Sequence, residues 1–341
     1  MDRDALKLTT YFGERQRTGD AFVADALLDL YGRHEVRTSI LLRGAEGFGL
    51  RHHLRTDRLL TLSEDLPVVA VAVDRRERIE ALLREATALE RPGLVTLERA
   101  RLVDGDLAAA TLPGDLADEA KLTVYVGRRE TVRGVPAFVA ACDLLHRRGV
   151  AGATALLGVD GTAHGARRRA RFLGRNADVP MRVIAVGPGE RIAAVLPERA
   201  AQLARPLVTL ERVQVCKRDG ELLGRPRPPA EAGTWQKLMV YGSEQAKFEG
   251  APLHVALVRG LREAGARGAT ALRGVWGFHG AHPPHGDRLL QVRRHVPVVT
   301  VVVDTPEAIA RAFAVIDAAT GERGLVTSEA VPTAQPSARP Y

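Results

Sequence analysis

The chain has 341 residues, a net charge of +8, 45% hydrophobic and 26% charged residues, but only 4% aromatic residues. These values are typical of a globular protein of two or three domains with aliphatic cores. The sequence lacks a long apolar run, a signal-peptide pattern and a CxxC pair, so we expect no transmembrane helix, no secretory leader and no disulfide scaffold. We therefore expect a cytoplasmic protein. Its positive charge is modest and spread along the chain, so we do not expect nucleic acid as a partner.

One block of the sequence occurs three times. Its opening stretch reads KLTTYFG from Lys7, KLTVYVG from Lys121 and KLMVYGS from Lys237. This spacing is too long for a solenoid unit and suits a small complete domain. The three predicted repeats are residues 5–103, 120–216 and 236–331. Two linkers, 104–119 and 217–235, connect them, and a disordered tail is expected at 332–341.

The first repeat predicts six elements. In chain order they are a strand at 6–12, a helix from 22, a strand at 38–43, a strand at 66–74, a helix at 76–89 and a strand at 93–98. Apolar residues at helical spacing and β-branched runs support this assignment. The order β-α-β-β-α-β indicates a ferredoxin-like α+β domain. Its two helices would cover one face of the sheet and leave the other face in need of a partner.

The other repeats follow the same order of elements. Apolar strands are expected at 153–158, 179–186 and 206–211 in the second repeat, and at 269–274, 296–304 and 324–327 in the third. In each repeat a long polar loop follows the second strand. The loops at 45–61, 159–178 and 275–295 differ from one another far more than the strands do.

The pattern KLTVYVGRRE, ATALLGVDG, VPMRVIAVG and RPLVTLERV resembles the bacterial family known as domain of unknown function 190, which is PII-like. The resemblance extends over each repeat. It implies three ferredoxin-like domains that form an intramolecular pseudo-trimer, because PII-like proteins are typically compact homotrimers. It also implies that small effectors, often adenine nucleotides, bind in the clefts between domains.

The resemblance further implies that the long loops correspond to the mobile arms, or T-loops, of PII proteins. Glycines at the loop bases would let backbone N–H groups approach an anion. The alternative is a solvated basic hairpin without a ligand. The candidate ligand-binding residues at the loop bases are Gly47, Phe48, Gly49, Gly158, Gly161, Gly165, Gly277, Phe278 and Gly280.

Basic residues after the last strand are a second set of candidates. Arg99 and Arg101, and Lys217 and Arg218, resemble the basic segment that contacts nucleotide phosphates in PII proteins. The third repeat has no basic residue at this place, which puts its cleft in doubt. The alternative is that these side chains only make the surface soluble.

Neither a metal site nor an active site is expected. The histidines His279, His282 and His285 are weak metal candidates because no cysteine or carboxylate accompanies them. The sequence has no nucleophile with a base, no P-loop and no GxGxxG between a strand and a helix. We expect a non-enzyme without a resident cofactor, with an adenine nucleotide as the possible effector.

The functional expectation is a monomeric, PII-like regulator. An anionic effector would bind between repeats and change how the arms engage a membrane transporter, a channel or another target. The alternative is a structural or partner-docking module without a small-molecule ligand.

Overall fold

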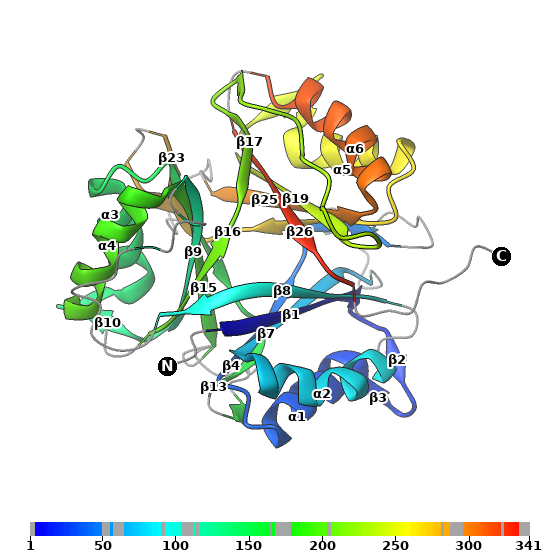
Figure 1. The fold of residues 1–341 in the computed structure, drawn as a ribbon, viewed down its shortest axis with the longest axis vertical. Coiled ribbons are helices and arrows are strands. Elements are labelled where there is room, and N and C mark those ends of the chain that lie inside the picture. Colours follow the sequence, from blue (N-terminus) through cyan, green and yellow to red (C-terminus); the bar gives the residue numbers. More distant parts are fainter. Residues whose placement is uncertain are drawn as a thin grey trace.

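A computed structural model describes residues 4–49, 55–56, 65–89, 93–103, 112, 116, 118–163, 165–167, 179–202, 206–280, 283–286, 296–321 and 324–333. Three repeats surround a common centre, with their helices on the outside and their strands inside (Figure 1). The α+β class and the three tandem repeats are therefore confirmed. No helix in the described ranges has both the length and the apolar character needed to cross a membrane.

The first repeat has four long strands, two helices and short hairpin strands. The long strand β7 is buried on both faces because valine and alanine fill it, and it lies between β4 and β1. The elements are β1 (Asp4–Gly13), β2 (Arg17–Thr18), β3 (Ala21–Phe22), α1 (Val23–Arg33), β4 (Thr38–Arg43), β5 (Glu46–Phe48), β6 (Arg55–Thr56), β7 (Pro67–Arg75), α2 (Arg76–Leu89) and β8 (Leu94–Leu102).

The second repeat has the same order, and its last strand continues after a short break. Its elements are β9 (Glu119–Gly127), β10 (Thr131–Val132), β11 (Val135–Pro136), α3 (Ala137–Arg147), β12 (Gly152–Leu157), β13 (Asp160–Ala163), β14 (Ala166–Arg167), β15 (Pro180–Pro188), α4 (Gly189–Gln202), β16 (Leu207–Arg212), β17 (Gln214–Arg218) and β18 (Glu221–Leu222).

The third repeat closes the chain. Its helix α6 begins with Thr305 as the cap, whose Oγ1 accepts a hydrogen bond from Ala308 N at 3.4 Å. The elements are β19 (Trp235–Ser243), β20 (Lys247–Phe248), β21 (Ala251–Pro252), α5 (Leu253–Glu263), β22 (Ala269–Arg273), β23 (Trp276–His279), β24 (His285–Gly286), β25 (Pro297–Asp304), α6 (Pro306–Ala319) and β26 (Leu325–Val331).

Each sheet has two covered faces. The outer face packs against the helices of its own repeat and forms a separate aliphatic core in each case. The inner faces meet in a fourth core at the centre, where side chains from all three repeats, such as Val71, Tyr125 and Val301, pack together. The face that the sequence leaves without a partner is therefore covered by the two other repeats.

A short strand from each repeat crosses to the preceding repeat, counted cyclically. Strand β13 pairs with β4, β23 pairs with β12, and β5 pairs with β22. Each of these strands lies at the base of a long loop. Since the three pairings form a closed cycle, every repeat both donates a strand and receives one.

The end of each last strand pairs in the opposite direction, with the following repeat. Strand β8 pairs with β16, β17 pairs with β26, and Thr333 forms a bridge with Thr96. Two predicted boundaries change as a result. The sequence predicts Lys217 as the first residue of a linker, but it belongs to β17. The predicted tail is ordered at its start, because Pro332 O accepts a hydrogen bond from Leu97 N at 2.9 Å. Residues 334–341 lie outside the described residues.

Candidate functional site

Three of the predicted loop-base glycines lie where the crossing strands meet the neighbouring repeat. A Cβ atom added to any of them would lie only 2.2–2.4 Å from a backbone oxygen of the adjacent strand. The residues are Gly47, Gly161 and Gly277. Glycine is therefore required here for close backbone approach, and the space beside it is filled by protein. A ligand-binding role for these glycines stays a prediction.

The predicted aromatic residues anchor the crossing strands. Phe48 of the first repeat is buried in the helix-side core of the third, and Phe278 of the third is buried in that of the second. The Phe278 ring lies edge-on to His146, with ring centroids 5.0 Å apart. At the corresponding place the second repeat has Thr162, whose Oγ1 lies 2.9 Å from Ser39 Oγ. Both phenylalanines thus contribute to the interfaces between repeats.

The remaining candidate glycines differ in how much open space surrounds them. A Cβ on Gly158 would lie 2.7 Å from Pro180 O, and Gly165 has φ +77° and lies against the backbone of Gly32. Gly49 and Gly280 have open space, with no heavy atom within 4 Å of an added Cβ. These two could be approached by a ligand.

Three basic candidates at the strand exits, Lys217, Arg218 and Arg99, have acidic partners. Lys217 Nζ lies 2.6 Å from Asp317 Oδ1, and Arg218 forms an ion pair of 2.5 Å with Glu119. Arg99 and Glu231 are 3.7 Å apart and highly exposed, so this contact is weak. Arg101 lies exposed on β8. An incoming phosphate would have to compete with carboxylates at Lys217 and Arg218.

A small cleft lies between the second and third repeats. Its walls come from β12, β15, β19, β23, β25 and β26, and it lies at the base of the third repeat's loop. The lining includes Gly152, Thr154, Tyr241, Gly242 and His279. His279 also pairs with Asp219, with Nε2 and Oδ1 2.9 Å apart. Its volume of about 20 Å³ holds roughly one water molecule, so a larger ligand would reach the backbone, hydroxyl and imidazole groups only if the cleft opened.

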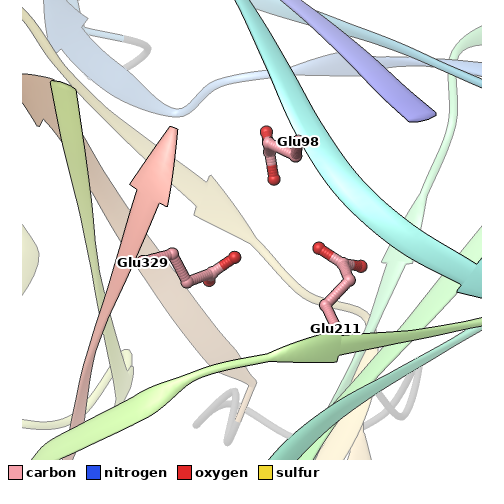
Figure 2. Close-up of side chains that lie close together, drawn as sticks. All are labelled: Glu98, Glu211 and Glu329. Atoms are coloured by element: carbon pink, nitrogen blue, oxygen red, sulfur yellow. The ribbon is translucent and has the colours of Figure 1, made fainter. Parts of the chain in front are cut away.

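The predicted histidine cluster is only partly described. His285 Nδ1 lies 2.9 Å from Pro283 O, His279 pairs with Asp219, and His282 lies outside the described residues. Within the described part of the chain, the potential metal ligands that lie together are three buried glutamates, one from each repeat (Figure 2). They are Glu98, Glu211 and Glu329.

These glutamates form a closed ring with the three lysines that open the repeats. Lys7 bridges Glu98 and Glu211, Lys121 bridges Glu211 and Glu329, and Lys237 bridges Glu329 and Glu98. Within each repeat the lysine Nζ lies 2.6 Å (Lys7–Glu98), 2.8 Å (Lys121–Glu211) or 3.1 Å (Lys237–Glu329) from the glutamate carboxylate oxygen. The lysines supply the positive charge that a metal ion would bring. The ring therefore joins all three repeats without a metal.

Hydroxyl groups support the ring in two of the three repeats. Thr9 Oγ1 donates to Glu98 Oε1 at 2.9 Å, and Thr123 Oγ1 lies 3.5 Å from Glu211 Oε1. The third repeat has Met239 at the equivalent position, and Glu329 Oε1 has no hydrogen-bond partner among the described residues. The ring is thus asymmetric, with its least satisfied carboxylate in the third repeat.

The protonation of the ring is set by burial and by its alternating charges. Burial tends to raise the pKa of Glu98 and Glu211, but the neighbouring ammonium groups outweigh it and hold both carboxyls well below the usual range. Burial lowers the pKa of Lys7 to about 8. Burial opposes the charge of Lys121 and Lys237 as well, but the surrounding carboxylates raise the pKa of both. At neutral pH these groups are ionised.

Sequence reasoning missed this ring although its signal was present. A lysine precedes an apolar residue in each opening strand, and a glutamate ends each VTL or VTS run of the last strand. Alternation along a strand places these charges on the inner face, opposite the helices. Three lysines and three glutamates, one of each on every buried inner face, are expected to pair with one another.

Comparison with known proteins places the chain in a family. The model of DUF190, described as "Uncharacterized ACR, COG1993", matches residues 5–102, 119–215 and 235–333. The chain belongs to the DUF190 family. It contains three tandem copies of this PII-like unit, as the sequence resemblance implied.

A curated DUF190-like relative is the size of one repeat. The UPF0166 protein of Aquifex aeolicus (strain VF5) is 33% identical over 94 residues, which cover 28% of this chain and 88% of that protein. A crystal structure of aspartate kinase from Synechocystis aligns over 96% of this chain and 51% of its own, with 12% identity and a TM-score of 0.26. That structural likeness is too low to support any inference.

Proposed function

We propose that this protein is a PII-like regulator without enzymatic activity, built as an intramolecular pseudo-trimer of ferredoxin-like repeats. A small anionic effector, such as an adenine nucleotide, would bind between repeats. The observation that supports this proposal most is the cleft between the second and third repeats, lined by Thr154, Gly242 and His279. It occupies the place where the family resemblance locates an effector.

The residues that line this cleft are not all kept at the other two interfaces between repeats. The side chain at the position of Thr154 is Ile40 in the first repeat and Thr270 in the third. Ile40 Cγ1 would lie 2.8 Å from a Cβ added at Gly158, so this isoleucine fills the space next to the crossing strand of the second repeat. We therefore assign effector binding to the cleft lined by Thr154.

Regulation would follow from the position of the cleft at a loop base. An effector that contacts the crossing strand can favour one arrangement of the attached loop over others, and it acts only through this differential affinity. A loop arranged in this way would then engage or release a target, such as a membrane transporter or channel.

Calorimetric titration with ATP, ADP, AMP and cyclic nucleotides tests the proposal. Thr154→Ile copies the first repeat and should fill the cleft, so we expect it to remove binding. Thr270→Ile makes the same change at the equivalent position of the third repeat, away from this cleft, and is the matched control that should leave binding intact. The absence of heat for the wild-type protein at concentrations that detect micromolar binding would reject a nucleotide effector.

A second candidate function is a partner-docking module without a ligand. It is favoured by the ion pairs Lys217–Asp317 and Arg218–Glu119, which occupy two of the predicted phosphate-binding side chains. Affinity capture of partners with and without nucleotide distinguishes the two functions. The same partner, recovered in the same amount under both conditions, would favour docking alone.

A further inference from the structure

The central core contains one arginine that breaks the similarity of the repeats. Arg182 on β15 is only 6% exposed. Its neighbours Met181 and Val183 belong to the helix-side core, so alternation directs Arg182 to the inner face. The equivalent residues of the other repeats are Val69 and Val299.

The guanidinium of Arg182 has no polar partner among the described residues. Its Nε is buried without a hydrogen-bond acceptor, and no carboxylate of the described ranges forms an ion pair with it. Its Cζ lies 6.0 Å from the centroid of the Tyr125 ring, the residue opposite it on β9. This cation–π contact compensates only part of the cost of removing the charge from water.

The nearby charged groups do not neutralise Arg182. Glu211 and Glu98 are the carboxylates that interact with it most strongly, but each is bound by two lysines of the ring. Because the ring contains three positive and three negative groups, it is neutral as a whole. Among the described residues of the central core, Arg182 is therefore a positive charge without a carboxylate of its own.

Tyrosine hydroxyls surround this charge. The Tyr125 hydroxyl is buried without a partner among the described residues, and Tyr241 donates only to Met239 Sδ, a weak acceptor, at 3.4 Å. Burial raises the pKa of Tyr125 to about 12, so its hydroxyl stays protonated and can donate. Tyr11, the third of these tyrosines, is only partly buried against the same core. Solvent therefore reaches the edge of this group.

We infer that Arg182 binds a small inorganic anion, a halide or an oxyanion, in the central core beside the hydroxyl of Tyr125. The guanidinium donates hydrogen bonds from a planar fork, and the phenol hydroxyl donates one more. An anion that accepts these bonds would give the unpartnered Arg182 Nε and Tyr125 hydroxyl a partner each. The site faces the common centre of the three repeats. Arg182 and Tyr125 do not line the effector cleft, although Tyr241 borders both places.

Thermal unfolding at constant ionic strength tests the site. Sodium chloride, nitrate or phosphate replaces sodium gluconate stepwise, so that the anion changes and the ionic strength does not. The wild-type protein should show a saturating rise in Tm of about 2–4 °C with at least one of these anions. Arg182→Val copies the residue of the other repeats and should abolish the saturating rise. An equal saturating rise in both proteins, or none in the wild type, would overturn the inference.

Two further measurements keep the test decisive. Arg182→Lys retains the charge but lacks the fork, and it should shift the midpoint of an oxyanion response to at least about tenfold higher concentration. If Arg182→Val does not fold, bromide-soaked crystals of the wild-type protein decide the matter. An anomalous peak beside the Arg182 guanidinium is expected, and its absence would reject a halide site. For an oxyanion site the deciding result is the Arg182→Lys variant. A nitrate or phosphate response that this variant leaves unchanged would reject the oxyanion site.

Discussion

At the scale of single residues, the ring of lysines and glutamates is the feature with the largest energetic consequences. Each charge has two opposite charges beside it, which offsets the cost of removing it from water. A buried ion pair contributes little by itself compared with an apolar pair. The loss of one member is costly, however, because its partners remain charged and buried.

Replacement of Glu211 by glutamine tests this asymmetry. The change keeps the volume but leaves Lys7 and Lys121 with one carboxylate each, so we expect a loss of about 3–5 kcal/mol in the free energy of unfolding. Urea denaturation measures it. The control is Glu85→Gln, which weakens surface contacts with Arg33 and His34 and should change the stability by less than about 0.5 kcal/mol. Similar effects of the two changes would show that the ring is not buried as described.

The ring also predicts the response of stability to acid. The lysines hold the pKa of Glu98 and Glu211 below the ordinary carboxyl value of about 4.3, so the unfolded chain takes up protons first as the pH falls. The stabilisation is therefore complete above this value and decreases as the pH falls below it. Thermal unfolding from pH 7 to pH 3 measures the decrease. Glu211→Gln should show a shallower dependence than the wild-type protein, whereas Glu85→Gln should not.

At the scale of elements, the crossing strands at the loop bases decide how the repeats are connected. Their glycines touch the backbone of the neighbouring repeat, and Phe48 and Phe278 enter its core. The sequence predicts a glycine-rich loop at these positions but not its function, because the partner strand lies in another repeat. The motif therefore has a structural explanation before any ligand is considered.

Two glycines of the same Gly-Phe-Gly motif allow a matched test. Gly47→Ala should place a methyl group 2.4 Å from Ala269 O and weaken the pairing of β5 with β22, at a cost of about 1–3 kcal/mol. Gly49→Ala meets nothing within 4 Å and should be nearly neutral. Urea denaturation of both variants measures the difference. Equal stability of the two variants would contradict the close approach.

At the scale of the whole molecule, the repeats close on one another within a single chain. Two sets of strand pairings run around the centre in opposite directions, and the central core takes side chains from every repeat. A repeat removed from this arrangement would expose its inner face, and its lysine and glutamate would keep each other but lose their partners in the other two repeats. The three repeats are therefore expected to depend on one another for stability.

Solution measurements check this interdependence. Light scattering should give the mass of one chain, 36.8 kDa, because each inner face is already covered. Urea should unfold the protein in a single transition seen alike by fluorescence and circular dichroism, since the central core is shared. A trimer of chains, or three separate transitions, would show that the repeats do not close on each other.

The sequence by itself determined the three repeats, their order of strands and helices, and which strands are buried, because these follow from local periodicity and from the recurrence of the same residues. Only the tertiary structure decided which strands pair between repeats, that Lys7 meets Glu211 from 204 residues away, and that Arg182 lies in a core where no described carboxylate forms an ion pair with it. Such contacts depend on how three similar surfaces close around one centre. Local sequence patterns specify the surfaces, but the partner of each charge is set by the packing of the whole chain.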